Sequence, residues 1–214
     1  SCRRHFGGLK KLFMPLYLRS KYNDMLIGLF FGSFNPVHIG HLIIAQAALE
    51  LANLDEVWFI VSPQNPLKKN NNLLHEFDRY DMVEMAIREN DRFKVSDIEF
   101  HMPRPSYTID TLTYLRSKYP AHQFRLIMGN DNLVILPKWK NSQRILDEFG
   151  IVVYPRLAGV NEKPVEHPNI IYFDAPLLAI SATYIRECIK EGRSIRYLVP
   201  KSVSEHIDAR KFYS

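Results

Sequence analysis

Short apolar runs alternate along this chain with longer segments in which apolar residues recur at helical spacing. The runs predict a strand covered on both faces at 26–31, further strands at 57–61, 124–128, 151–154 and 170–173, and an edge strand at 93–100. The spaced segments predict helices at 39–53, 78–89, 108–118, 142–148, 182–191 and 202–209. Because strands alternate with helices, we expect βαβ units and an α/β fold: a Rossmann-like open parallel sheet with helices on both faces.

The expected fold indicates where a ligand would bind. In open α/β sheets, ligands bind outside the carboxyl ends of the strands. The loops to inspect therefore follow Phe31, Val61, Met128 and Phe173.

Residues 1–24 do not share the pattern of the remaining sequence. They show no steady period and are interrupted by Gly7, Gly8 and Pro15. We therefore expect a single domain at 25–214, preceded by a flexible leader or a start-site extension. An organellar transit peptide is the alternative, because the segment is basic and nearly free of acidic residues.

Composition narrows the class of protein. Hydrophobic residues make up 46% of the 214 residues and charged residues 24%, which is typical of a globular protein and excludes a disordered chain. The two cysteines, Cys2 and Cys188, are too few for a disulfide framework, and no apolar run approaches the roughly 18 residues of a membrane span. We expect a cytoplasmic protein without a membrane contact.

The net charge of +5 comes from the leader. Six of the 28 basic residues and one of the 23 acidic residues lie in 1–24, so residues 25–214 hold 22 of each. A domain without net charge is a poor candidate for binding the phosphate backbone of a nucleic acid. We therefore expect no nucleic-acid partner for the domain.

Candidate chemistry follows the first strand, where residues 32–41 read GSFNPVHIGH. Gly32 and Ser33 would let backbone N–H groups approach a phosphate, and Gly40 would leave room for a ligand beside the backbone. His38 and His41 are three residues apart at a helix start, so they share one face beside its positive dipole end. The segment lacks the ending of a Walker loop and the neighbouring ligands of a zinc site.

Residues 32–41 closely resemble the signature of the nucleotidylyltransferase superfamily, whose core is HxGH. Residues 180–186, ISATYIR, resemble its second signature, ISxTxIR. Three further segments look like those of bacterial nicotinate mononucleotide adenylyltransferases: PSYT at 105–108, MGND at 128–131 and PKW at 137–139. The resemblance spans about residues 25–212. It implies transfer of the adenylyl group of ATP to nicotinate mononucleotide, with release of pyrophosphate, in NAD biosynthesis.

The resemblance also implies an ATP site. His41 would hydrogen-bond the α-phosphate in the transition state, and His38 would hold the outgoing phosphates. The other ATP-binding positions would be Gly32, Ser33, Phe34, Ser181, Thr183 and Arg186. Taken singly, Ser181 and Thr183 are as well explained by helix capping, and Arg186 by an exposed helix face.

For the mononucleotide, the resemblance implies that Trp139 stacks on the pyridine ring while Thr108 and the backbone N–H of Lys140 receive its carboxylate. Asp131 would contact a ribose hydroxyl or the metal-bound phosphates, and Lys68 the mononucleotide phosphate. Where relatives commonly have a histidine before this lysine, the chain has Leu67. Mg²⁺ is expected with ATP, held mainly by phosphates and water, so no protein metal site is expected.

Three other functions stay open at this stage. Phosphopantetheine adenylyltransferases share both signatures but are usually shorter and lack the segment at 137–139. A non-catalytic nucleotide sensor could use the same fold, although the intact histidine pair and Arg186 argue against it. Nucleic-acid binding is favoured only by the charge of residues 1–24.

Overall fold

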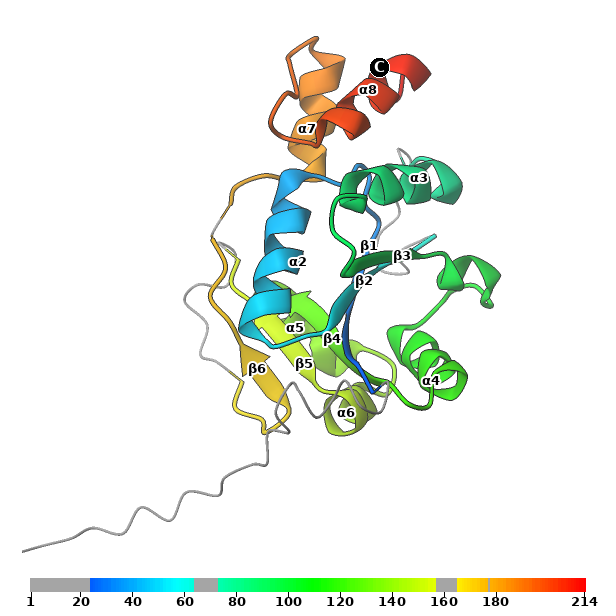
Figure 1. The fold of residues 1–214 in the computed structure, drawn as a ribbon, viewed down its shortest axis with the longest axis vertical. Coiled ribbons are helices and arrows are strands. Elements are labelled where there is room, and N and C mark those ends of the chain that lie inside the picture. Colours follow the sequence, from blue (N-terminus) through cyan, green and yellow to red (C-terminus); the bar gives the residue numbers. More distant parts are fainter. Residues whose placement is uncertain (1–23, 64–72, 157–164, 177) are drawn as a thin grey trace, which may run out of the picture.

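A six-stranded parallel sheet forms the centre of the protein, with its strands in the order β3-β2-β1-β4-β5-β6 (Figure 1). The computed structural model describes residues 24–63, 73–156, 165–176 and 178–214. The predicted fold class is confirmed. The strands are β1 (Leu26–Gly32), β2 (Glu56–Val61), β3 (Phe93–Ser96), β4 (Gln123–Gly129), β5 (Ile151–Tyr154) and β6 (Ile170–Tyr172).

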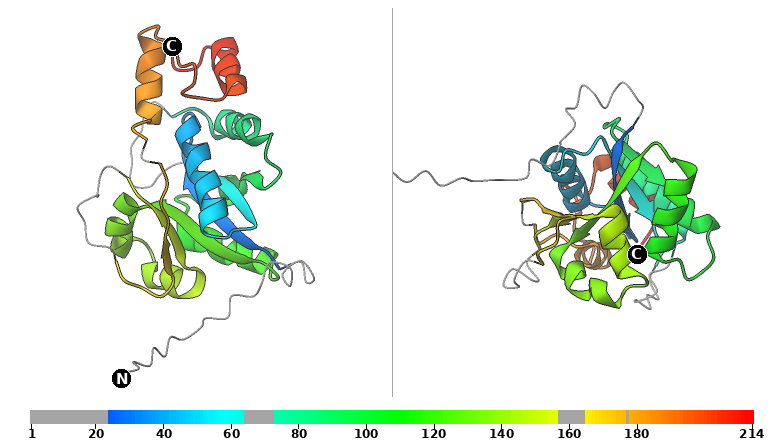
Figure 2. Two further views of the ribbon diagram at one scale, coloured as in Figure 1. Left: turned by 60° about the vertical axis from the view of Figure 1, so that its left-hand side comes forward. Right: turned by 90° about the horizontal axis from the view of Figure 1, so that it is seen from below.

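Helices cover both faces of this sheet and its carboxyl edge. The α-helices are α2 (Ile39–Leu51), α3 (Glu76–Ile87), α4 (Thr108–Lys118), α5 (Asn130–Ile135), α6 (Ser142–Arg144), α7 (Ala182–Lys190) and α8 (Lys201–Arg210). Shorter helical turns are η1 (Ile98–His101), η2 (Leu136–Lys138) and η3 (Ile145–Phe149). Helices α7 and α8 lie beyond the carboxyl ends of the strands, at the top of Figure 1 and in the left view of Figure 2.

The alternation of side chains along β1 divides the core in two. Leu26 and Phe30 point into a cluster built with α2, α3, α7 and α8, whereas Ile27 and Leu29 point into one built with α4 and η3. Gly28 lies on the first face, where a Cβ would come within 2.6 Å of the Ile127 side chain. Both faces of β1 are therefore buried, which is why the sequence of this strand is an uninterrupted apolar run.

The structure corrects two predicted elements and adds one that was not predicted. The strand expected at 93–100 ends at Ser96, because the chain turns into η1 and buries Glu99. The helix expected at 142–148 divides into α6 and the wider turn η3. Helix α5 was missed, since six residues are too few to show a helical period.

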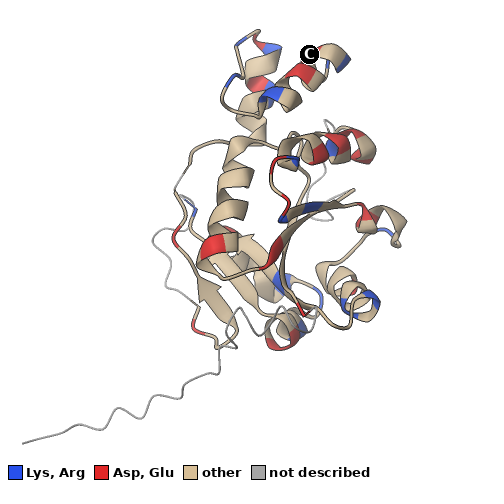
Figure 3. Cartoon of the chain, in the orientation of Figure 1, with Lys and Arg blue, Asp and Glu red and all other residues tan. Residues whose placement is uncertain are grey.

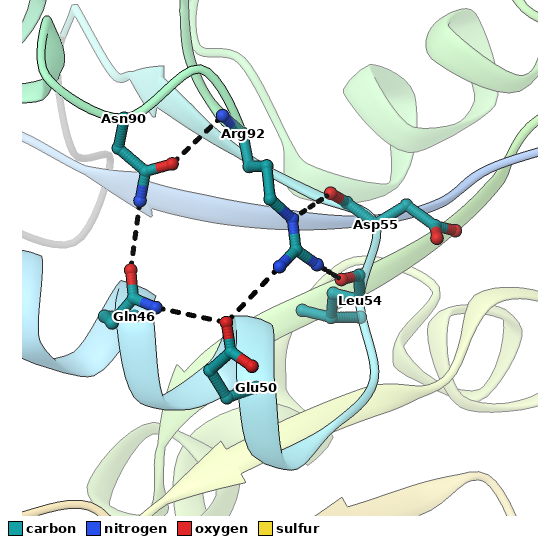
Figure 4. Close-up of polar contacts among 6 residues, drawn as sticks. All are labelled: Gln46, Glu50, Leu54, Asp55, Asn90 and Arg92. Atoms are coloured by element: carbon teal, nitrogen blue, oxygen red, sulfur yellow. Dashed lines mark hydrogen bonds and ion pairs between the residues drawn. The ribbon is translucent and has the colours of Figure 1, made fainter. Parts of the chain in front are cut away.

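A polar network ties the elements together at the amino end of the sheet, opposite α7 and α8 (Figure 4). Arg92 donates to the backbone carbonyls of Leu54 (2.5 Å) and Asp55 (3.0 Å), and to Glu50 near the end of α2 (3.3 Å). The Asp55 carboxylate accepts the N–H of Leu26 at 2.6 Å. These contacts join the beginnings of β1, β2 and β3 to the end of α2.

Residues of both charge signs are interspersed along helices α3, α7 and α8 (Figure 3). This distribution agrees with the equal numbers of basic and acidic residues in 25–214. Within the described parts of the chain, no helix is both long and apolar enough to cross a membrane.

Candidate active site

A cleft of about 1470 Å³ opens at the carboxyl ends of the strands, where the fold predicted a ligand site. It collects residues from the turn after β1, the start of α4, the segment after β4 and the start of α7. Lys68 and Leu67 lie outside the described residues. All the other predicted site residues line this one cleft: Gly32, Ser33, Phe34, His38, His41, Thr108, Asp131, Trp139, Lys140, Ser181, Thr183 and Arg186.

His38 and His41 form a stacked pair at the beginning of α2. Their ring centroids are 3.7 Å apart with planes inclined by 28°. His38 is the N-cap residue, and its backbone N–H donates to Nδ1 of His41 at 3.2 Å. Because Nδ1 of His41 accepts this hydrogen bond, the neutral ring carries its proton on Nε2. His41 thus has Nε2–H as its hydrogen-bond donor.

Burial and nearby positive charge keep both rings neutral. Burial, and secondarily the charge of Arg156, lower the pKa of His38 to about 4. Burial, followed by His38 and then Arg156, lowers the pKa of His41 well below its usual range. Neutral imidazoles of such low basicity are suited to donate hydrogen bonds rather than to act as strong bases.

At two glycines of this turn, neighbouring side chains occupy the space that a Cβ would need. The His38 ring lies against Gly40, where a Cβ would meet its Nδ1 at 3.0 Å. The first histidine therefore lies where a Gly40 side chain would be. Because Gly40 also lines the cleft, its role of leaving room for a ligand stays a prediction. At Gly32 a Cβ would come within 2.8 Å of the Phe34 ring. Both glycines allow the histidine turn to pack against itself.

Phe34 anchors the turn below the cleft. Its backbone is left-handed, with φ of 44°, and its ring is only 2% exposed. The ring packs edge-on against Phe30 and His41 and lies tilted against Phe59. Because the Phe34 ring is buried in the core, the group through which this residue could contact a phosphate is its backbone N–H.

The start of α7 lies beside the start of α2. Ser181 is the N-cap residue of α7, and its hydroxyl accepts the N–H of Tyr184 at 3.1 Å. Arg186 donates to the backbone carbonyl of Asn35 (2.7 Å) and to the Thr183 hydroxyl (3.2 Å). The positively polarised first turns of α2 and α7 therefore face the same cleft. Arg186 lies there too, and its hydrogen bond to Asn35 connects the two signature segments.

A second group of residues lines the cleft around the start of α4. Lys140 pairs with Asp110 at 2.8 Å and lies 4.7 Å from the centre of the Tyr107 ring. These contacts hold the Trp139 segment close to Thr108, the first residue of α4. The indole N–H of Trp139 is buried and has no hydrogen-bond partner among the described residues.

Four residues at or beneath the cleft were not predicted from the sequence as functional residues. The first is Arg156. It follows β5 and lines the cleft. Its backbone N–H donates to Asn130 Oδ1 at 2.9 Å, and its guanidinium pairs with Asp131 Oδ2 at 3.2 Å. The other carboxylate oxygen of Asp131, Oδ1, is buried and has no partner among the described residues.

Arg79 lies beneath the cleft with no exposed surface. Its guanidinium donates to the backbone carbonyls of Leu74 (2.9 Å), Ser33 (2.5 Å), Ser62 (2.8 Å) and Pro63 (3.1 Å). Burial lowers its pKa to about 10, so it stays charged. Arg79 therefore joins the ends of β1 and β2 and places a positive charge behind the turn.

Glu99 is the third of these residues, a carboxyl group that is 3% exposed beside the cleft. Burial raises its pKa, while hydrogen bonds from Thr111, Ser62 and Ser106 oppose that rise. The Thr111 hydroxyl donates to it at 2.8 Å. Glu99 thereby ties α4 to the loop after β2.

Asn35 is the fourth. It is 2% exposed, and Oδ1 accepts the Tyr213 hydroxyl at 2.8 Å and the N–H of Leu74 at 3.3 Å.

Only the position of Asn35 inside a signature marked it in the sequence. In the sequence, Arg79 is one of several charged residues of a predicted helix, and Arg156 is one of several charged residues of a loop. The sequence offered no signal for either of them or for Glu99.

No cluster of three or more His, Cys, Asp or Glu side chains that could hold a metal occurs in the described part of the chain. The acidic atom best suited to a substrate-borne cation is Oδ1 of Asp131, because it is buried without a partner in the cleft. Such an atom fits a contact through the water shell of Mg²⁺.

Comparison with known proteins agrees with this geometry. A family model described as cytidylyltransferase-like matches residues 29–188. The chain is similar to a protein of Cytophaga hutchinsonii named "Probable nicotinate-nucleotide adenylyltransferase", with 58% identity over 190 residues, covering 89% of this chain and 99% of the relative. A Flavobacterium johnsoniae protein of the same name is 50% identical over 191 residues, covering 88% and 99%.

A solved structure has the same fold. The nicotinic acid mononucleotide adenylyltransferase of Plasmodium falciparum, complexed with NaAD, superposes with a TM-score of 0.73 over 88% of this chain and 97% of the other. The two chains share only 17% sequence identity, so this likeness concerns the fold alone.

Proposed function

Since the chain belongs to the cytidylyltransferase-like family, and within it to the nicotinate-nucleotide adenylyltransferases, we propose that it transfers the adenylyl group of ATP to nicotinate mononucleotide. The products are nicotinate adenine dinucleotide and pyrophosphate, which makes this a step of NAD biosynthesis. The observation that carries the proposal is the stacked, neutral His38–His41 pair at the start of α2, inside a cleft that also receives the start of α7.

The reaction joins two phosphates. An oxygen of the mononucleotide phosphate attacks the α-phosphorus of ATP and forms a new P–O bond. The bond from that phosphorus to the bridging oxygen breaks, and pyrophosphate leaves with the electron pair. A phosphate monoester with a second pKa near 6 is already ionised at neutral pH, so the attack needs no strong base. Positioning and charge stabilisation are the main tasks of the protein.

The residues around the turn after β1 suit those tasks. The Nε2–H of His41 donates to the α-phosphate as its charge changes, and His38 lies beside the outgoing phosphates. Ser33 and Phe34 offer backbone N–H groups. Because the Ser33 carbonyl points to Arg79, and the two ends of a peptide bond are antiparallel, the Phe34 N–H points away from Arg79.

ATP phosphates also reach the start of α7. The hydroxyls of Ser181 and Thr183, the first backbone N–H groups of the helix and the guanidinium of Arg186 form a donor group for the β- and γ-phosphates. The capping bond from Ser181 to Tyr184 is compatible with this role, because capping uses one lone pair of the hydroxyl.

The mononucleotide occupies the part of the cleft around α4. Trp139 stacks on the pyridine ring, and Thr108 and the Lys140 backbone N–H receive its carboxylate. The Lys140–Asp110 ion pair supports this assignment, because it brings the two segments together. Asp131 accepts a ribose hydroxyl, and Lys68 contacts the mononucleotide phosphate.

Asp131 would contact the water shell of Mg²⁺ bound to ATP, and the ion would supply positive charge that offsets the charge of the phosphates. We assign the reaction to the domain at residues 25–214 and to the cytoplasm, where a buried thiol such as Cys188 stays reduced. Nucleic acid has no part in it.

Pyrophosphate release measured with ATP and a panel of acceptors tests the function. The panel holds nicotinate mononucleotide, nicotinamide mononucleotide and phosphopantetheine, each at several concentrations. We expect the highest kcat/KM with nicotinate mononucleotide. A preference for phosphopantetheine, or no turnover with any mononucleotide, would contradict the proposal.

A further inference from the structure

Arg156 is fixed in the cleft by three contacts with the junction of β4 and α5. Its backbone N–H binds Asn130, and its guanidinium pairs with Asp131. Its aliphatic chain lies on Gly129, where a Cβ would come within 2.6 Å of Cδ of Arg156. The backbone and the aliphatic part of Arg156 are thus held in place, and its guanidinium makes one ion pair within the cleft.

The charge of Arg156 acts on both catalytic histidines. It is the charged side chain that lowers the pKa of His38, and it contributes to lowering that of His41. Arg156 also lines the same cleft as the pair, where it follows β5, whereas Arg186 belongs to α7. Because the imidazoles are neutral, Arg156 supplies a formal positive charge that they lack.

Three other cations of the cleft have polar partners of their own. Arg104 pairs with Glu76 at 2.6 Å, Lys140 pairs with Asp110, and Arg186 binds the Asn35 carbonyl. By contrast, Arg156 makes one contact with Asp131, at 3.2 Å, between side chains that are 47% and 32% exposed. Such a pair is weak, and among the described residues it uses one of the five guanidinium N–H groups.

We propose that Arg156 is a further catalytic residue, which donates to the ATP phosphates at the bond that breaks and holds the leaving pyrophosphate. This rests on the proposed function. A forked guanidinium matches two phosphate oxygens at once, and its charge opposes the negative charge that moves onto the leaving group. Phosphate binding replaces the weak contact with Asp131, which then has its carboxylate for a ribose hydroxyl.

Arg156→Gln tests this role, with Arg144→Gln as the control. Arg144 also pairs with a carboxylate, Glu148, and its side chain is 48% exposed, but it lies on α6 away from the cleft. We expect R156Q to lower kcat at least 30-fold without changing Tm, and R156K to fall between R156Q and the wild type. R144Q should stay within twofold of the wild type. R156Q activity within threefold of the wild type would overturn the proposal.

Inorganic pyrophosphate separates a phosphate contact from an indirect effect through Asp131, because it has neither ribose nor base. Its binding, measured by calorimetry, should weaken at least tenfold in R156Q and should not weaken in Asp131→Asn. Equal affinities in R156Q and the wild type would overturn the role of Arg156. Failure of the wild type to turn over any mononucleotide would instead contradict the proposed function, and the pyrophosphate titration would still test the site.

Discussion

The guanidinium of Arg186 donates to the backbone carbonyl of Asn35 at 2.7 Å, across a separation of 151 residues. This one hydrogen bond joins the two segments that resemble superfamily signatures, one after β1 and one at the start of α7. Its second nitrogen binds the Thr183 hydroxyl, so the guanidinium is held in place at the edge of the cleft. This hydrogen bond helps to hold together the two segments that we propose to bind the phosphates of ATP.

Replacing Arg186 should impair the use of ATP more than the use of the mononucleotide. Charge-assisted hydrogen bonds contribute about 1.5–3 kcal/mol, so Arg186→Gln should lower kcat/KM for ATP by about tenfold to a hundredfold. Arg193→Gln is the matched control, because Arg193 pairs with Glu191 just beyond the other end of α7. Steady-state kinetics with each substrate varied in turn would measure both. Equal losses for the two substrates would contradict the assignment of Arg186 to ATP.

His41→Ala should lower kcat by roughly 10²-fold with little change in Tm, because a lost transition-state donor costs about 3 kcal/mol. His101→Ala serves as the control, since that side chain is 70% exposed and pairs with Asp97. Pyrophosphate release and thermal unfolding should be measured on the same preparations. A His41 variant within threefold of the wild type would remove this residue from the mechanism.

The lowered pKa of His38 predicts how stability depends on pH. The folded protein binds the proton at about pH 4, whereas the unfolded chain binds it at about 6.5. Between these values the unfolded state takes up more protons, so the contribution of His38 is complete above pH 6.5 and is lost as the pH falls to 4. It amounts to something on the order of 3 kcal/mol.

Urea unfolding of the wild type and His38→Gln at several pH values would measure this contribution. The difference in unfolding free energy between the two proteins should shrink as the pH falls from 6.5 to 4. A difference that stays constant over this range would show that His38 titrates normally in the folded protein.

The base pocket should prefer nicotinate over nicotinamide mononucleotide by tenfold to a hundredfold in kcat/KM. A site that offers only N–H and O–H donors favours a carboxylate, because an amide turns its own donors toward some of them. Thr108→Val should reduce the preference by removing one donor at nearly constant shape. Thr113→Val is the control on the same helix, where the hydroxyl donates to the Ile109 carbonyl at 2.7 Å. Equal kcat/KM for the two mononucleotides would refute the pocket but not adenylyl transfer.

Local patterns in the sequence were enough to predict the parallel α/β fold and most of its elements. A buried strand such as β1 must be apolar on both faces, and helices must repeat their apolar positions, so both leave a mark within a few residues. The two signature segments likewise carry their chemistry in adjacent residues. Elements without a period were predicted poorly: α5 is too short, and η1 and η3 are irregular turns.

Only the tertiary structure showed which distant residues complete the cleft. Arg79 and Arg156 resemble ordinary charged residues in the sequence, and Glu99 resembles part of an edge strand. Their roles come from partners 12 to 46 residues away. The position of the His38 ring against Gly40 also needed coordinates, because spacing does not reveal which way a side chain turns. Secondary structure is set largely by neighbours along the chain, whereas burial, pKa and hydrogen-bond partners are set by neighbours in space. The sequence alone therefore determined the fold class and the histidine turn, and the folded chain decided what surrounds that turn.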